Sequence, residues 1–286
     1  MSLRARLAKP DPVLAPLVLN PLMAALAREA GFEALYLGGG STGYAKVSLE
    51  ANLSLTEMVQ TGVEIRAAVD LPLILDGACG WGDPMHMHRT VNQAEIAGFD
   101  AIEIEDQILP KRAHHHVGIE HMVPTELMVA KIREAVVARR RPDFLIVART
   151  NAVRHPGMDD ALRRAEAYRA AGADLLLLPR APEDIRLVGE RIGGPLMYLC
   201  PPGGLAALDM TTADMAGLGY RILVDPTTPL LAAYETMRAV YTEMAQGFRI
   251  RSRPHGELKA LQERMHETIG LETLLEIERR TVERGH

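Results

Sequence analysis

Short apolar segments recur along the chain, separated by longer segments whose apolar positions repeat every three or four residues. Each short segment is apolar almost throughout, which is typical of parallel strands that are buried on both faces. We expect strands at Val13–Leu19, Ala34–Leu37, Leu73–Asp76, Ala101–Glu105, Phe144–Arg149, Leu175–Leu178, Leu196–Leu199 and Tyr220–Val224.

The longer segments between these strands have helical periodicity. They are Pro21–Ala30, Thr56–Val69, Pro84–Ala97, Thr125–Arg140, Met158–Ala171, Pro182–Ile192 and Thr212–Leu218. Three of them are followed by a glycine, namely Gly31, Gly98 and Gly172, which is typical of a helix C-terminus. Eight strands that alternate with helices predict an α/β protein with a (β/α)8 TIM barrel rather than a doubly wound sheet.

The C-terminal part departs from this alternation. Pro229–Gln246 is expected to form the eighth helix, and Gly256–Glu283 one or two further amphipathic helices. No low-complexity linker precedes them, so we expect a barrel over 1–246 and a helical extension of the same domain over 247–286. The extension would either cap the barrel's own surface or pack on a neighbouring subunit.

Composition and charge narrow the class of protein. Of the 286 residues 48% are hydrophobic and 4% aromatic, and the net charge is −5, so neither nucleic acid nor an anionic membrane is an expected partner. Cys79 and Cys200 are too few for a disulfide framework and fit a reducing cytoplasm. The first apolar run contains Pro16 and lacks a cleavage site, so no secretory signal is expected, and no stretch predicts a membrane span.

Polar residues gather where the predicted strands end, and in a parallel barrel these ends form the active-site face. A glycine-rich run, Gly38–Gly43, follows the second strand, and its backbone amides can cradle an anionic group. Asp76 ends the third strand, Glu105 the fourth and Arg149 the fifth. Two acids and an arginine on neighbouring strands predict a divalent-metal site beside a clamp for a carboxylate.

Each of these residues also has a structural interpretation. Asp76 and Glu105 could be caps or ion-pair partners, and Arg149 could pair with Glu105 alone. Glu103 lies on the same side of its strand as Glu105 and would support it from behind. The triplet His114–His116 does not predict zinc, because three consecutive histidines do not easily converge on one ion.

The combined motifs resemble the isocitrate lyase and phosphoenolpyruvate mutase superfamily. The similarity runs from about Pro21 to Ala245 and rests on several motifs in order. These are the glycine-rich run, Asp-x-x-x-Gly-aromatic-Gly-Asp from Asp76, Glu-Asp-Gln from Glu105, Lys-Arg-x-x-His from Lys111, Ala-Arg-Thr-Asn from Ala148, and Leu-Gly-Tyr-Arg-Ile from Leu218.

This resemblance implies a tetrameric (β/α)8 barrel whose eighth helix is exchanged with a neighbouring subunit. It also implies a bound Mg²⁺ or Mn²⁺ and an enolate formed from a small 2-oxo or 2-hydroxy acid. By position Asp76 would be the main metal ligand and Glu105 a second one. The other implied site residues are Gly39, Gly40 and Arg149 for the substrate carboxylate, Lys111, Arg112 and His115 on a gating loop, and Ser41, Trp81 and Arg180 around the substrate.

The sequence also departs from the superfamily's pattern. Lyases of the methylisocitrate type carry a cysteine as proton donor in the gating loop, where this chain has Ala113. The second aspartate of the metal motif is Ala78, and the usual upstream aspartate aligns with Asn52. Arg180 replaces a glutamate and Leu199 an asparagine. The loss of these acids and the gain of the Arg180 cation favour a substrate with anionic groups. In place of the missing cysteine, a histidine such as His115 would protonate the enolate.

We therefore expect a divergent member: a metal-dependent lyase that cleaves or decarboxylates an oxaloacetate-like or 2-alkylmalate-like acid. One alternative is phosphorus–carbon chemistry of the phosphonopyruvate mutase or hydrolase type, which Arg180 would suit. A second alternative is a barrel that binds an acid without catalysis, although it gives no use for Asp76, Glu105 and Arg149 together.

Overall fold

The structure is a computed structural model that describes residues 2–154, 156–178 and 182–283. Two compact units make up the chain, Met1–Leu230 and Leu231–His286. In the described part of the first unit, eight parallel strands lie in the order β1-β8-β7-β6-β5-β4-β3-β2. They are β1 Val13–Pro16, β2 Leu35–Leu37, β3 Leu73–Asp76, β4 Ala101–Glu105, β5 Leu145–Arg149, β6 Leu175–Leu177, β7 Leu196–Leu199 and β8 Tyr220–Asp225.

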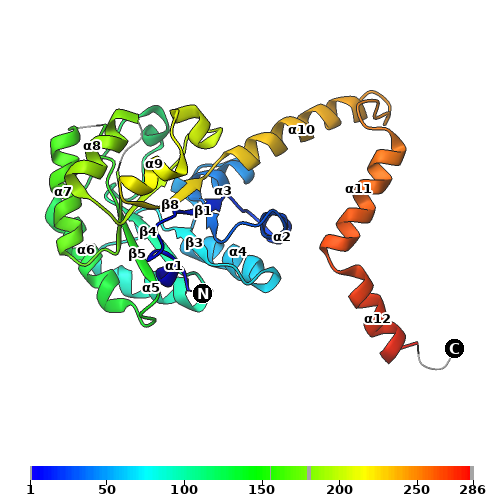
Figure 1. Ribbon diagram of the computed structural model, residues 1–286, viewed down its shortest axis with the longest axis horizontal. Coiled ribbons are helices and arrows are strands. Elements are labelled where there is room, and N and C mark those ends of the chain that lie inside the picture. The colour runs from blue at the N-terminus through cyan, green and yellow to red at the C-terminus, as the bar shows by residue number, and fades with distance from the viewer. Residues whose placement is uncertain (1, 155, 179–181, 284–286) are drawn as a thin grey trace. The chain divides into compact units, whose positions relative to one another are not determined.

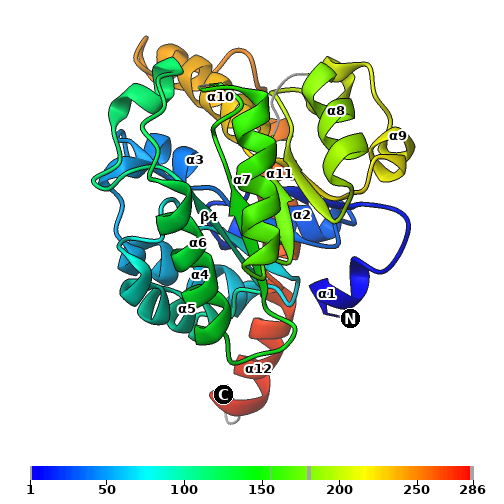
Figure 2. The same ribbon diagram turned by 90° about the vertical axis from the view of Figure 1, so that its left-hand side faces the viewer.

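A parallel bridge between Leu17 and Tyr36 brings β1 next to β2, so the sheet is nearly closed into a barrel. Helices surround the strands (Figures 1 and 2), and the predicted TIM barrel is confirmed. The helices of this unit are α1 Leu3–Arg6, α2 Pro21–Glu29, α3 Gly39–Ala45, α4 Leu55–Ala68, α5 Met87–Ile96, α6 Thr125–Ala138, α7 Met158–Ala170, α8 Pro182–Ile192 and α9 Thr212–Gly217.

The helix ends follow from local sequence chemistry. Gly31, Gly98 and Gly172 all have positive φ angles, of 91°, 87° and 105°, so the predicted glycine stops are confirmed after α2, α5 and α7. At its start α4 carries a capping box in which Ser54 and Glu57 satisfy each other's backbone amides.

The glycine-rich run after β2 forms a helix, α3, which glycine content alone would disfavour. A Cβ at Gly43 would lie 2.6 Å from the backbone carbon of Leu49, so only glycine allows the next loop to pass this closely. Packing against that loop therefore outweighs the weak helix propensity, and it holds the loop at Glu50 against the barrel mouth.

The core has two layers. The interior of the barrel is filled by small and branched side chains from every strand, and Leu3 of α1 joins this cluster. A larger cluster lies between the strands and the surrounding helices. Residues at the strand ends are held from both sides by these layers, which gives polar groups there fixed directions.

The second unit contains most of α10 Thr228–Met244, together with α11 His255–Thr268 and α12 Leu271–Thr281. This unit carries many exposed apolar side chains on its helices and the turns beside them, namely Leu231, Tyr234, Met237, Tyr241, Phe248, Leu258, Leu261, Met265, Ile269, Leu274, Leu275, Ile277 and Val282. The division at residue 246 into a barrel and an extension of the same domain stays a prediction. Among the described residues no helix is long and apolar enough to cross a membrane.

Packing of α4 on the barrel predicts a sharp effect of one methyl group. A Cβ at Gly62 would lie 2.3 Å from the ring of Phe99, which is fully buried. We expect Gly62→Ala to lower the free energy of unfolding by about 1–3 kcal/mol, measured by urea denaturation. The control is Gly217→Ala in α9, where a Cβ meets nothing within 4 Å. An unchanged midpoint for Gly62→Ala would contradict this packing.

Candidate active site

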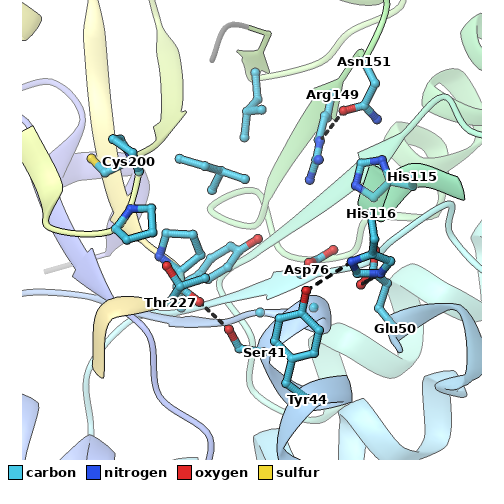
Figure 3. A pocket seen from close by; sticks show the side chains of 18 of the residues that line it. Ser41, Tyr44, Glu50, Asp76, His115, His116, Arg149, Asn151, Cys200 and Thr227 are labelled. Carbon is cyan, nitrogen blue, oxygen red and sulfur yellow. Dashed lines mark hydrogen bonds and ion pairs between the residues drawn. The ribbon is translucent and has the colours of Figure 1, made fainter. Parts of the chain in front are cut away.

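A cavity of about 370 Å³ opens at the C-terminal ends of the strands, where the sequence predicts the site. Cys200 and Thr227 lie across it from Arg149 and His115 (Figure 3). The polar lining consists of Tyr36, Ser41, Tyr44, Glu50, Asp76, Lys111, His115, His116, Arg149, Asn151 and Thr227. The remaining lining consists of Gly38, Gly40, Leu177, Leu178, Leu199, Cys200, Pro201, Pro202 and Pro226. The cavity therefore has a charged side and a largely apolar side.

Asp76 ends β3 at the charged side. Its Oδ2 accepts a hydrogen bond of 2.8 Å from the Gly39 amide, and its Oδ1 one of 3.0 Å from the Ala78 amide. Ala78 has a positive φ of 44°, so a strained turn holds its amide toward the carboxylate. The two amides fix the carboxylate while each oxygen keeps lone-pair capacity for a ligand. The Gly39 amide, expected to meet substrate, is thus engaged by Asp76.

The gating-loop lysine reaches the strand ends. Lys111 Nζ contacts Glu105 at ion-pair distance and lies 2.7 Å from Glu50 Oε1. Burial alone would raise the pKa of Glu105, but Lys111 and Arg149 hold that pKa well below its usual value. Burial opposes the charge of Lys111 as well, yet Glu105 and Glu50 raise its pKa. All three side chains are therefore charged at neutral pH.

Glu50 was not expected in the site. In the resemblance described above, the aspartate that usually lies upstream of the metal motif aligns with Asn52. The Asn52 side chain is exposed and donates to Ser48 Oγ at 3.0 Å. Asn52 thus brings no carboxylate to the cavity, but Glu50 brings one from the same loop. Its buried Oε2 accepts no hydrogen bond from the described residues and lies 3.3 Å from His116 Nε2, at ion-pair distance.

Arg149, at the end of β5, lies between two buried acids. Its Nη1 donates to Glu103 at 2.8 Å, and its Nε lies 3.4 Å from Glu105 and donates to Asn151 at 3.2 Å. None of the described residues accepts a hydrogen bond from Nη2, and Arg149 lines the cavity. The predicted pairing with Glu105 is thus present, but it leaves one nitrogen of the guanidinium for a ligand.

Glu103 is a buried acid behind Arg149. The Tyr36 hydroxyl donates to it at 3.0 Å. Burial raises the pKa of Glu103 to about 7, against the opposing effect of Arg149. Tyr36 belongs to the cluster that fills the barrel, so its contact with Glu103 agrees with the expected interior side of β4.

The three histidines of the gating loop have different surroundings. His115 and His116 line the cavity, whereas His114 faces His121 at 3.2 Å between ring nitrogens. His115 Nδ1 lies 2.9 Å from Glu120, and His116 Nδ1 lies 3.2 Å from the Tyr44 hydroxyl. The triplet does not converge on one point, in agreement with the argument against zinc.

Other expected site residues are only partly brought together. Gly40 and Ser41 line the cavity, and the Ser41 hydroxyl donates to the Pro226 carbonyl at 2.5 Å. Trp81 lies outside the lining and donates to the Leu53 carbonyl at 2.9 Å. Arg112 is exposed and also lies outside it. Arg180 falls outside the described residues.

Asn151 and Cys200 are lining residues that the sequence did not single out. Asn151 Nδ2 donates to Glu105 at 2.8 Å, so it fixes the same acid as Lys111. The signal was its place two residues after Arg149 at the end of β5. Burial raises the pKa of the Cys200 thiol to about 12, so Cys200 is a neutral, nearly apolar wall residue at neutral pH.

Hard carboxylate oxygens at the charged side suit Mg²⁺ or Mn²⁺ better than a softer ion. The described residues hold no group of three or more acidic, histidine or cysteine ligands. Mg²⁺, however, usually binds through one or two carboxylates with water and substrate completing its shell. Asp76 and Oε2 of Glu50, which accepts no hydrogen bond from the described residues, both lie against the Gly39–Gly40 backbone, which fits such a site.

Comparison with known proteins places this geometry in context. The sequence profile of the phosphoenolpyruvate phosphomutase family matches residues 3–245. The chain is 36% identical over 239 residues to 2,3-dimethylmalate lyase of Eubacterium barkeri, covering 81% of each chain. It is 37% identical over 248 residues to 2-methylisocitrate lyase of Aeropyrum pernix, covering 85% of this chain and 79% of the relative. Over 214 residues it is 34% identical to oxaloacetate decarboxylase of Paraburkholderia xenovorans, covering 71% of each.

Solved structures agree with this result. Phosphonopyruvate hydrolase in complex with oxalate and Mg²⁺ superposes with a TM-score of 0.84 and 30% identity, covering 98% of both chains. The structure of 2,3-dimethylmalate lyase, described as a member of the PEP mutase/isocitrate lyase superfamily, superposes with a TM-score of 0.81 and 26% identity. It covers 98% of this chain and 99% of that one. The resemblance seen in the sequence is confirmed.

The raised pKa of Glu103 predicts a pH-dependent stability. The folded chain keeps a proton on Glu103 up to about pH 7, whereas the unfolded chain releases it near the ordinary value of 4.5. Between these values the folded state binds more protons, so this group makes stability fall as pH rises. Each pKa unit corresponds to about 1.4 kcal/mol, so we expect this group to lower the free energy of unfolding of wild type by about 2 kcal/mol between pH 5 and pH 8. Glu103→Gln should not show this decrease.

Urea denaturation of both proteins at pH 5 and pH 8 measures this difference. The exposed Glu64→Gln in α4 serves as the control and should follow the wild-type dependence. Parallel pH profiles for wild type and Glu103→Gln would show that Glu103 is already ionised at pH 5.

Proposed function

The chain belongs to the phosphoenolpyruvate phosphomutase family, and on this basis we propose that it is a metal-dependent lyase for a small 2-oxo or 2-hydroxy acid. It would cleave or decarboxylate the acid at a carbon–carbon bond through an enolate. The relatives named as dimethylmalate lyase, methylisocitrate lyase and oxaloacetate decarboxylase support this reaction class. The observation that carries the proposal is that Arg149, whose Nη2 none of the described residues engages, lines the same cavity as Asp76.

The chain's own charges supply most of the proposed chemistry. Arg149 would bind the substrate carboxylate and stabilise negative charge on the enolate oxygen, because its guanidinium is already fixed by Glu103 and Asn151. Fixed donors of this kind do not have to reorganise when charge develops, which is what favours the transition state over the ground state.

Asp76 and Glu50 would hold a divalent cation, with Glu105 as the supporting acid. When bound, Mg²⁺ or Mn²⁺ supplies Lewis-acid charge at the oxygen that becomes the enolate oxygen. Lys111 would keep the gating loop over the cavity by its ion pairs to Glu50 and Glu105, and so exclude water. With alanine at position 113, His115 would deliver the proton to the enolate carbon.

Phosphorus–carbon chemistry is less well supported. A phosphonopyruvate hydrolase is among the similar structures, at 30% identity. The relatives found by sequence and named above are two lyases and a decarboxylase, at 34–37% identity. The apolar wall formed by Leu177, Leu199 and Pro226 also suits a carbon substituent better than a second highly charged group.

We further propose a homotetramer located in the cytoplasm. The many exposed apolar side chains between Leu231 and Val282 support assembly, because large exposed apolar areas are normally covered by a partner. Both cysteines are free and buried, which fits a reducing compartment.

Release of pyruvate or glyoxylate from a panel of acids tests the reaction class. The panel holds oxaloacetate, methylisocitrate, 2,3-dimethylmalate and phosphonopyruvate, each with Mg²⁺ and with EDTA. We expect turnover of a carbon acid that EDTA abolishes, and at least a 100-fold loss of kcat/KM in Asp76→Ala. Mg²⁺ should raise the melting temperature of wild type but not of Asp76→Ala.

The control for this experiment is Asp70→Ala, whose side chain is 99% exposed at the end of α4. It should match wild type in turnover and in the response to Mg²⁺. If no acid of the panel is turned over and Mg²⁺ does not change the melting temperature, the proposal is contradicted and an acid-binding barrel is favoured. Turnover of phosphonopyruvate alone would favour the phosphorus–carbon alternative.

Assembly is tested separately by light scattering after size exclusion. We expect the mass of four chains for the full protein at micromolar concentration. Replacing Tyr234 and Met237, both exposed on α10, with lysine should lower the mass, because charge would enter an apolar contact. A monomeric mass for wild type would contradict the tetramer.

A further inference from the structure

A fully buried carboxylate lies in the gating loop, next to a stretch of exposed residues. The side chain of Glu120 has 0% exposure, whereas the neighbouring residues 116–119 are exposed. His115 Nδ1 lies 2.9 Å from Glu120 Oε2 and Arg154 Nη1 2.8 Å from Oε1, and the Gln107 amide donates to Oε2. Glutamate is almost never fully buried unless it is paired, so this loop is built around the carboxylate.

The contacts of Glu120 determine which nitrogen of His115 carries a proton. Burial would raise the pKa of Glu120, but His115 and Arg154 lower it, so the carboxylate is ionised at neutral pH. An ionised carboxylate only accepts hydrogen bonds, and therefore Nδ1 of His115 must donate. Gln107 Nε2 also lies 2.7 Å from this Nδ1, but with Nδ1 protonated it donates to Glu120 Oε2 instead.

The other nitrogen of His115 is left for the cavity. Among the described residues none bonds His115 Nε2, and the side chain lines the cavity (Figure 3). His116 differs, because its two ring nitrogens face Tyr44 and Glu50. Within the triplet, His115 thus combines a place in the cavity with a ring nitrogen that no described residue engages.

We propose that Glu120 is a positioning residue that holds His115 with a protonated Nδ1 and turns Nε2 toward the substrate. This inference rests on the proposed function, in which His115 protonates the enolate. The Nε2–H bond of the imidazolium breaks, the enolate electron pair forms the new C–H bond, and neutral His115 keeps its Nδ1 proton. A new proton from the solvent then binds Nε2 and replaces the one that the carbon received. Glu120 stabilises the imidazolium beforehand and orients its ring.

Arg154 belongs to the same arrangement. Its Nη1 donates to the His115 carbonyl at 3.4 Å as well as to Glu120, so it holds both the backbone and the orienting carboxylate. Arg154 follows β5, and Gln107 follows β4. The loop is therefore fastened to two strand ends, which is how a histidine on a loop acquires a fixed direction.

A double-mutant cycle separates positioning from plain loop stability. On the best acid of the panel we expect Glu120→Gln to lower kcat about 10- to 100-fold with KM changed less than about threefold. His115→Gln should lower kcat at least as much, and the double variant should match His115→Gln alone. Losses that multiply in the double variant would overturn the proposal.

The matched control is Glu134→Gln. Glu134 lies 2.7 Å from His88 Nε2, but both side chains are nearly half exposed and neither lines the cavity. This variant removes a carboxylate from a histidine in the same way, and its kcat should equal that of wild type. A loss equal to that of Glu120→Gln would overturn the proposal.

A spectroscopic readout tests Glu120 without any turnover. In protein labelled with ¹⁵N at histidine, the His115 signals are assigned by their loss in His115→Gln. We expect an Nδ1–H signature for the neutral ring in wild type that changes in Glu120→Gln. An Nε2–H ring, or no change in Glu120→Gln, would overturn the positioning role. If no acid is turned over but the Nδ1–H signal of His115 is observed and changes in Glu120→Gln, the proposed reaction is rejected while the positioning role of Glu120 stays supported.

Discussion

The structure of the barrel mouth depends on the neutralisation of buried carboxylates. Glu50, Glu103 and Glu105 are all less than a tenth exposed, and Asp76 lies beside them. Unpaired charges in such a place would cost several kcal/mol each, so they persist only because cations lie among them. Arg149 lies between Glu103 and Glu105, and Lys111 between Glu105 and Glu50. The pKa of Glu103 is raised by burial, which shows where this neutralisation is least complete.

The two cations come from elements of different rigidity. Arg149 ends a strand between two layers of packed side chains, so its direction is set by the core. Lys111 lies on the loop after β4, and if that loop gates the cavity as proposed, the ion pairs of Lys111 form only while the loop covers the mouth. The neutralisation of Glu50 and Glu105 by Lys111 therefore depends on the position of this loop. Opening the loop would leave Glu50 and Glu105 without Lys111, which favours the covered arrangement.

The sequence was most informative where burial determines the residue type. Short, almost wholly apolar runs predicted the strands, and the charged residues that end three of them, Asp76, Glu105 and Arg149, stand out because an apolar residue would otherwise be there. It was least informative in the loops. Glu50 and Asn52 are two residues apart, and only the turn before α4 decides which of them faces the cavity. Trp81 was equally ambiguous, because its indole direction follows from a positive φ of 53°.

The gating loop shows why an alignment of single positions can miss a residue that takes over a lost role. Ala113 removes the acid that the resemblance assigns to this loop, which on its own indicates lost chemistry. Two residues later His115 faces the same cavity, and the residues that orient it, Glu120 and Arg154, come from two different loops. A proton donor requires a direction and a supporting charge as well as an acidic group, and those properties reside in tertiary contacts. Loss of one side chain is therefore compatible with the same class of reaction when a neighbouring side chain is held in place by the fold.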